Sequence, residues 1–394
     1  MPEPTAPSGD AELFHDLARL CATRPADELF QAVVDRLTAA GRYAELFEAL
    51  KLQLRHRLGL PLLASGTEQL DEPVQAEYEA ALIDACRRVG LLLLDDGRIR
   101  DAWTYLRPVG NQGEVIGRLR RVEVSSENVD QLVEVLLYEG LDPPRGYQLL
   151  LEHFGTCNAI TAYQSAFYGR PRPQRAAAAG LLVGHLYREL CQNIVSHAER
   201  NGIAAPPSAS LSDLIRDCPQ LFAEGGYHID TTHLSSVINI AREVTDATHL
   251  RQALELADYG GGLDPSLQYP SEPPFEETYR THRLWFAAQL GQEVEPALEY
   301  FRERAEQTDA RHQGTQVIEY YVDLLDRLGR SQPALEESLR LIPAGVHTVG
   351  WAPSLLELAH HAGSYGQLIE SARQRGELFG FLLGLLGQQG QRLL

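Results

Sequence analysis

One short segment concentrates the side chains of this sequence that could do chemistry. Residues 227–236 read YHIDTTHLSS, so two histidines flank an aspartate. If the chain before Thr231 is extended, His228 and Asp230 project to the same side, because alternate residues of an extended strand share a face. Imidazole and carboxylate groups at this spacing predict a catalytic acid/base pair, His228 with Asp230, or a divalent metal held by His228, Asp230 and His233.

A second set of candidate ligands lies on a long predicted helix, from about residue 174 to residue 200. His185 and Glu189 are four residues apart, so they share a helix face and could hold the same metal ion. Asn193 and His197 continue the row at the same spacing. The predicted metal set is therefore His228, Asp230 and His233, with His185 and Glu189 as further ligands.

The same residues also have structural interpretations, which the sequence leaves open. The next helix is predicted to begin at about Ser235. Asp230 is a residue type that caps helices, and His233 near that helix start could be an interior histidine with ordinary hydrogen bonds. A polar row at four-residue spacing, such as His185 and Glu189, is also typical of a solvent-facing helix side.

Composition narrows the classes of function. The 394 residues carry a formal charge of −19, which disfavours binding to nucleic acids or to anionic membranes. Five scattered cysteines without a C-x-x-C spacing argue against a zinc knuckle or a disulfide framework. The acidic, proline-rich start has no signal-peptide pattern, and the apolar stretch Phe379–Leu386 is too short to span a bilayer. These features predict a cytoplasmic protein.

The elements that position these side chains are predicted to be helices throughout. Apolar residues recur at i, i+3, i+4 and i+7, as in Leu13, Leu17 and Leu20, and no run alternates as strands do. Glycines such as Gly41 and Gly140 follow the apolar runs, where helices commonly end. The sequence therefore predicts an all-α fold.

Residues 89–106, VGLLLLDDGRIRDAWTYL, resemble a tetratricopeptide repeat. In that pattern Gly90 packs one helix against the next, Gly97 forms the turn, Ala102 lies where the helices cross, and Leu106 fills an apolar slot. Gly291, Gly329 and Gly363 are 38 and 34 residues apart, close to the roughly 34-residue repeat. The family's terminal proline is absent. The resemblance implies stacked antiparallel helical hairpins, an α-solenoid.

The repeat-like rhythm is interrupted in the middle of the chain. The interruption begins at Pro171, includes the long helix and the histidines, and ends with an irregular stretch, Gly260–Pro274. We therefore predict four regions: a disordered start at 1–9, N-terminal helical hairpins at 10–170, a non-repetitive central section at 171–274, and C-terminal helical hairpins at 275–394.

The sequence is compatible with two alternative functions. Stacked hairpins form concave grooves, so the first is a scaffold that binds a partner protein or peptide, with a basic or amphipathic ligand favoured by the acidic charge. The alternative is a metal-dependent enzyme of hydrolase or oxygenase type. It would use a divalent transition metal at the His/Asp cluster, a small-molecule substrate, and the stretch 260–274 as a lid.

Overall fold

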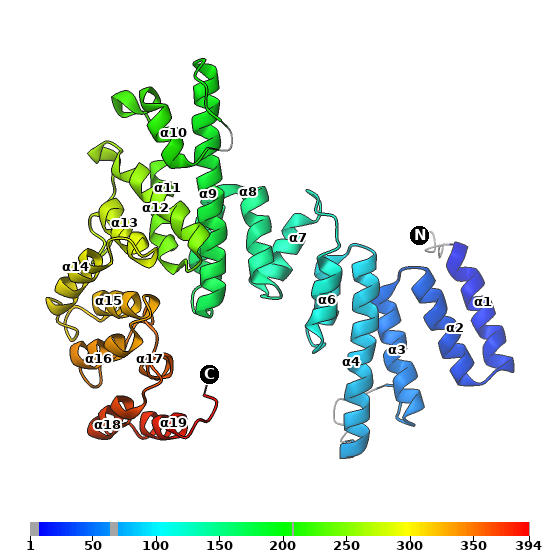
Figure 1. The fold of residues 1–394 in the computed structure, drawn as a ribbon. Coiled ribbons are helices and arrows are strands. Elements are labelled where there is room, and N and C mark those ends of the chain that lie inside the picture. The colour runs from blue at the N-terminus through cyan, green and yellow to red at the C-terminus, as the bar shows by residue number, and fades with distance from the viewer. Residues whose placement is uncertain (1–7, 64–69, 207–208, 394) are drawn as a thin grey trace. The chain divides into compact units, whose positions relative to one another are not determined.

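The computed structural model describes residues 8–63, 70–206 and 209–393, and every regular element within those ranges is a helix (Figure 1). The predicted all-α class is confirmed. The chain forms two compact units, residues 1–153 and 154–394. Of the start predicted to be disordered, 1–9, residues 1–7 lie outside the described part, and the first helix begins at Ser8. None of the described helices combines the length and apolar character needed to cross a membrane.

Unit 1 is a succession of helices (Figure 1). Glycines in the left-handed conformation, such as Gly41 with φ 66°, connect successive helices. The helices of this unit are α1 (Ser8–Thr23), α2 (Ala26–Ala39), α3 (Tyr43–Arg57), α4 (Glu72–Asp95), α5 (Ile99–Leu106), α6 (Gln112–Leu119), α7 (Val129–Val133) and the π-helix η1 (Glu134–Tyr138). Helices α1 to α4 each pack against the next helix in sequence, whereas α6 packs against α4, and α7 and η1 pack against α5.

The hairpin of α4 and α5 has the local packing that the repeat-like residues predicted. Gly90 lies against α5 so closely that an added Cβ would be 2.4 Å from Leu106 Cγ. Gly97 makes the turn with φ 74°, and both Ala102 and Leu106 are buried. Sequential helical hairpins are thus present, although this packing alone assigns no family.

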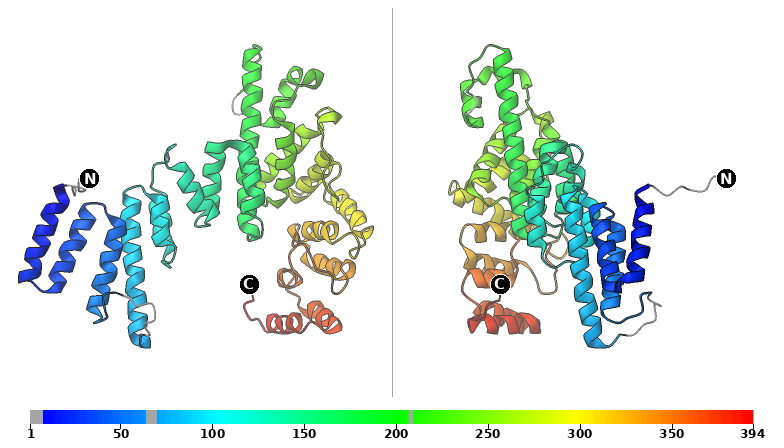
Figure 2. Two further views of the ribbon diagram at one scale, coloured as in Figure 1. Left: turned by 180° about the vertical axis from the view of Figure 1, so that it is seen from behind. Right: turned by 90° about the vertical axis from the view of Figure 1, so that its right-hand side faces the viewer.

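Unit 2 begins within α8 (Pro143–Ala166), where Gly155 breaks the helix with φ 78°. The long helix α9 (Arg172–Arg200) follows, starting two residues earlier than predicted. Its 29 residues span about 44 Å. Several shorter elements pack along it (Figure 2): α10 (Leu211–Asp217), η2 (Pro219–Gly225), α11 (Thr231–Ile240), η3 (Ala241–Glu243) and α12 (Ala247–Gly261).

The predicted irregular stretch Gly260–Pro274 begins one residue before the end of α12. It contains one short 3₁₀ turn, η4 (Pro265–Leu267), and leads to α13 (Thr278–Gln289). Hydrogen bonds tie it to neighbouring helices: Asn239 Nδ2 donates to Ser271 Oγ at 2.9 Å, and Tyr300 Oη donates to the carbonyl of Pro274 at 2.9 Å. The role of this stretch as a lid stays a prediction.

The C-terminal part of unit 2 is again a succession of helices that contact their neighbours. Its core is aromatic: Phe275, Trp285 and Phe301 are fully buried, and their ring centroids lie 5.4 to 5.8 Å apart. The remaining helices are α14 (Val294–Glu306), α15 (Gln316–Arg327), α16 (Ser331–Leu341), α17 (Leu355–His361), α18 (Gly366–Arg375) and α19 (Leu378–Gln388).

Candidate functional site

The segment that carries the predicted histidines is the start of a helix. Asp230 caps α11: its Oδ1 accepts hydrogen bonds from the backbone N–H groups of Thr232 at 2.8 Å and His233 at 3.1 Å. These bonds, led by the one from the Thr232 hydroxyl, lower the pKa of the Asp230 carboxyl. The predicted helix start near Ser235 is wrong, because Asp230 captures the free N–H groups and the helix begins at Thr231.

His228 pairs with a histidine of α9. Its Nε2 is 2.9 Å from Nδ1 of His197, so one ring donates a hydrogen bond to the other. The backbone around His228 is held by Tyr259 Oη, which accepts from its N–H, and by Asn193, which donates to its carbonyl. Burial, and then the proximity of His197, lower the pKa of His228.

A shallow hollow of about 570 Å³ lies over this histidine pair. Of the predicted residues, His228, Asp230 and Glu189 line it, whereas His185 and His233 are not among its lining residues. His185 precedes His197 by 12 residues, about 18 Å along α9, which explains why another histidine meets His228. The hollow is lined by Glu189, Asn193, Ser196, His197, Arg200, Tyr227, His228, Ile229 and Asp230.

The carboxylates beside this hollow already have hydrogen-bond partners. Glu189 Oε2 accepts from the Thr156 hydroxyl at 2.9 Å, and Asp230 is the helix cap. In the described part of the chain, no three His, Cys, Asp or Glu side chains are grouped so that they could hold a metal ion. The metal site and the acid/base roles of His228 and Asp230 stay predictions from the sequence.

A second hollow, of about 400 Å³, lies among the C-terminal helices α15 to α19 and was not predicted. Leucine, isoleucine and valine side chains line much of it, and charged side chains, among them Glu377 and Arg375, also contribute to its lining. Its apolar lining residues include Val322, Ile342, Val346, Leu355, Leu356, Leu368 and Leu383.

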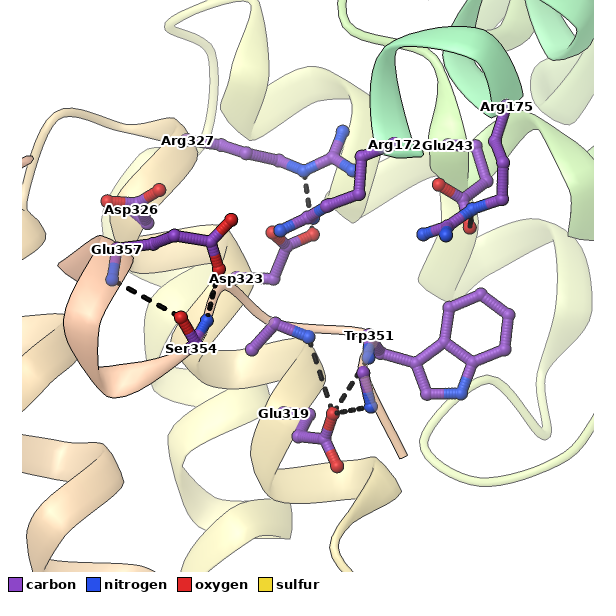
Figure 3. A network of polar contacts seen from close by, with 12 residues as sticks. Arg172, Arg175, Glu243, Glu319, Asp323, Asp326, Arg327, Trp351, Ser354 and Glu357 are labelled. Atoms are coloured by element: carbon purple, nitrogen blue, oxygen red, sulfur yellow. Dashed lines mark hydrogen bonds and ion pairs between the residues drawn. The ribbon is translucent and has the colours of Figure 1, made fainter. Parts of the chain in front are cut away.

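Buried Glu319 fixes one wall of this second hollow (Figure 3). Its carboxylate accepts from the backbone N–H groups of Val349, Gly350 and Trp351 at 2.7 to 2.8 Å. The hydroxyl of Thr315 donates to the same carboxylate at 2.5 Å. The loop between α16 and α17 is therefore fastened to α15 at one point. Nothing in the sequence indicated this, since the partners are about 30 residues apart.

An ion-pair network beside that loop connects α15 to the start of α9 (Figure 3). Buried Asp323 accepts from Arg172 of α9 and, at 2.7 Å, from Arg327 of its own helix. Arg327 also donates to the backbone carbonyl of Val244 at 2.8 Å. Removing one partner of a buried ion pair lowers the stability of a protein strongly, because the other charge is left uncompensated. This network therefore holds the C-terminal hairpins against α9.

Helix α19 has two unlike faces. On one face, glycines allow close packing: a Cβ added to Gly387 would be 2.3 Å from the Tyr365 ring, and one added to Gly384 would be 2.7 Å from Ile369. Away from this face, four apolar side chains are exposed, which we call the α19 stripe. Their exposed fractions are 75% for Leu378, 80% for Phe379, 47% for Leu382 and 38% for Leu385.

The sequence contained a signal for the α19 stripe. Gly380, Gly384 and Gly387 recur at four and three residues, which places small residues on one helix face and leaves the leucines for the other. The apolar length of Phe379–Leu386 does not by itself reveal this division into a face of small residues and a face of large apolar residues.

In comparisons with known proteins, no protein-family model and no curated protein match the chain.

Proposed function

We propose that this protein is a helical scaffold that binds another protein, and that the α19 stripe is part of its binding surface. The observation that carries the proposal is the exposure of the stripe. Leu378 and Phe379 are neighbouring residues of α19, and each is at least 75% exposed.

The free energy that a complex would gain by burying the α19 stripe supports the proposal. Burying a leucine or phenylalanine side chain stabilises a protein or complex by about 1.5–3 kcal/mol. Contiguous apolar patches on a soluble protein commonly mark interaction sites.

Close packing and hydrogen bonds that hold α19 and the adjoining loop in place also favour binding. The glycine face of α19 packs closely on α18, and Glu319 fixes the wall of the adjoining hollow. A surface that keeps its shape before binding loses less conformational entropy when the partner arrives. The tetratricopeptide-like hairpin of α4 and α5 is consistent with a scaffold, and membership of that repeat family is part of this proposal.

Photo-crosslinking tests the proposal. Benzoylphenylalanine is placed at Phe379, which preserves an aromatic side chain, and in a control at Tyr168, an aromatic residue that is 90% exposed and lies outside α19. Irradiation in the cells that produce the protein is expected to give a discrete protein adduct at Phe379 and none at Tyr168. No adduct at Phe379, or equal adducts at both positions, would contradict the proposal.

A further inference from the structure

We infer that the α19 stripe binds the same stripe of a second copy of this chain, so that the protein forms a two-fold symmetric dimer through its last helix. This inference rests on the proposed function, because it names the partner for that surface. Three properties of α19 and its surroundings support it: the distribution of charge, the self-complementary chemistry of the stripe, and its limited size.

Charge distinguishes this end of the chain from the rest. Residues 355–393 contain equal numbers of acidic and basic side chains, so their formal charge is zero, and the whole charge of −19 lies in the residues before them. The acidic residues are Glu357, Glu370 and Glu377, and the basic residues are Arg373, Arg375 and Arg392. Two copies that meet here avoid the repulsion they would experience elsewhere, since exposed charges beyond about 8 Å are largely screened.

The same charge distribution argues against a basic partner at this position. A basic protein or peptide would be drawn to the acidic part of the chain, where complementary charge steers association. Helix α19 itself has no charged residue, and the uncharged run continues to Gln391. A neutral apolar surface selects a partner that is also neutral and apolar, and the second copy provides one.

The stripe can pair with itself. A two-fold interface brings the same patch of each subunit together, so every residue in it must tolerate its own kind as a neighbour. Leucine and phenylalanine meet this condition, whereas a charged residue in the patch would face its like. At about 100° per residue, Leu378, Leu382 and Leu385 fall within one arc of the helix opposite the glycine face, which fits side-by-side helix packing. Phe379 borders this arc, about 60° from Leu382 around the helix.

The size of the stripe predicts a reversible dimer. Helix α19 has 11 residues, which gives it a length of about 16 Å. Stable interfaces bury about 800 Å² on each partner, more than one helix of this length covers. The dimer should therefore dissociate on dilution.

Sedimentation velocity of the purified full chain tests the inference. The wild-type protein is expected to shift from a monomer of 43.7 kDa towards twice that mass as its concentration rises from about 1 µM to about 100 µM. Phe379→Lys and Leu378→Lys, which change highly exposed side chains, should each remain monomeric over the same range. The control Tyr168→Lys, at an exposed aromatic residue outside α19, should dimerise like the wild type. Circular dichroism confirms that each variant is folded.

The outcomes separate this inference from the proposed function. Wild-type protein that is monomeric at about 100 µM overturns the dimer, and so does a Phe379→Lys variant that dimerises as the wild type does. If the protein is monomeric but Phe379 crosslinks to a different protein in cells, the proposed function stands and the second copy is the wrong partner. If it is monomeric and Phe379 forms no adduct, both fail. A dimer whose crosslink joins two copies through α19 supports both.

Discussion

Replacement of Glu319 by glutamine should release the loop that this carboxylate holds. Oε1 accepts from Thr315 and from the amide of Val349, and Oε2 accepts from the amides of Gly350 and Trp351. A glutamine side chain has only one acceptor oxygen. Its NH₂ group fits best towards Thr315, whose hydroxyl can accept, but there it faces the N–H of Val349 and leaves that donor without a partner.

The expected cost follows from the number of bonds affected. A hydrogen bond to a charged group contributes about 1.5–3 kcal/mol, and a neutral one about 1 kcal/mol. Losing the bond to Val349 and weakening those to Gly350 and Trp351 should cost about 2–4 kcal/mol in local stability. Where exchange follows the local opening equilibrium, even 2 kcal/mol corresponds to about 30-fold faster hydrogen exchange of these amides.

Hydrogen exchange resolved at single amides measures this effect where a global unfolding curve would not, because a chain of two units need not unfold in one step. Val349 should show the largest acceleration, with Gly350 and Trp351 next. Glu370→Gln makes the same chemical change at an exposed residue of α18 and should leave all three amides unchanged. Unchanged protection of Val349 in Glu319→Gln would refute the assignment of Glu319 as the anchor of the loop.

Three further predictions concern α19 and the histidine segment. Gly387→Ala should destabilise the α18–α19 hairpin by about 1–3 kcal/mol because its Cβ would overlap the Tyr365 ring, while Gly366→Ala, with open space around it, should not. Hydrogen exchange of the α19 amides in both variants decides this. Because the folded-state pKa of His228 is lowered, the unfolded state binds more protons below about pH 6.5, so stability should fall as pH drops from 6.5 towards that lowered pKa. His228→Asn should remove this part of the pH dependence, whereas His15→Asn, at an exposed residue, should retain it; an unchanged slope in His228→Asn would contradict the interpretation. Asp230→Ala should cost about 1 kcal/mol as a lost helix cap and Asp230→Asn only a few tenths, and equal, large losses in both variants would show that the charge of Asp230 has another role.

Local sequence patterns predicted much of the helical architecture. The hairpin of α4 and α5 depends on the absence of a side chain at Gly90 and on the left-handed turn at Gly97, and both effects act within about 17 residues. The long helix α9 was likewise predicted, with its start placed two residues later than in the structure. The start of α11 was misplaced because an aspartate before two threonines fits both an extended segment and a helix cap.

The arrangement of the candidate sites required tertiary information. His228 lies 31 residues from His197, and only the packing of α11 along α9 determines which histidine of the long helix it meets. Glu319 carried no motif, since its partners are backbone N–H groups of a distant loop, which any residue but proline supplies. The α19 stripe was readable in principle, because the spacing of Gly384 and Gly387 determines which face of the helix is free.

The central claim is that a second copy of this chain covers the exposed face of α19, and hydrogen exchange of residues 378–388 in dilute and in concentrated solutions tests it most directly. The account predicts that amides of α19 exchange more slowly as protein concentration rises, while those of α10 in the same unit do not change. Identical exchange of α19 at all concentrations in the wild type and in Phe379→Lys would contradict the claim that two copies of this chain meet there.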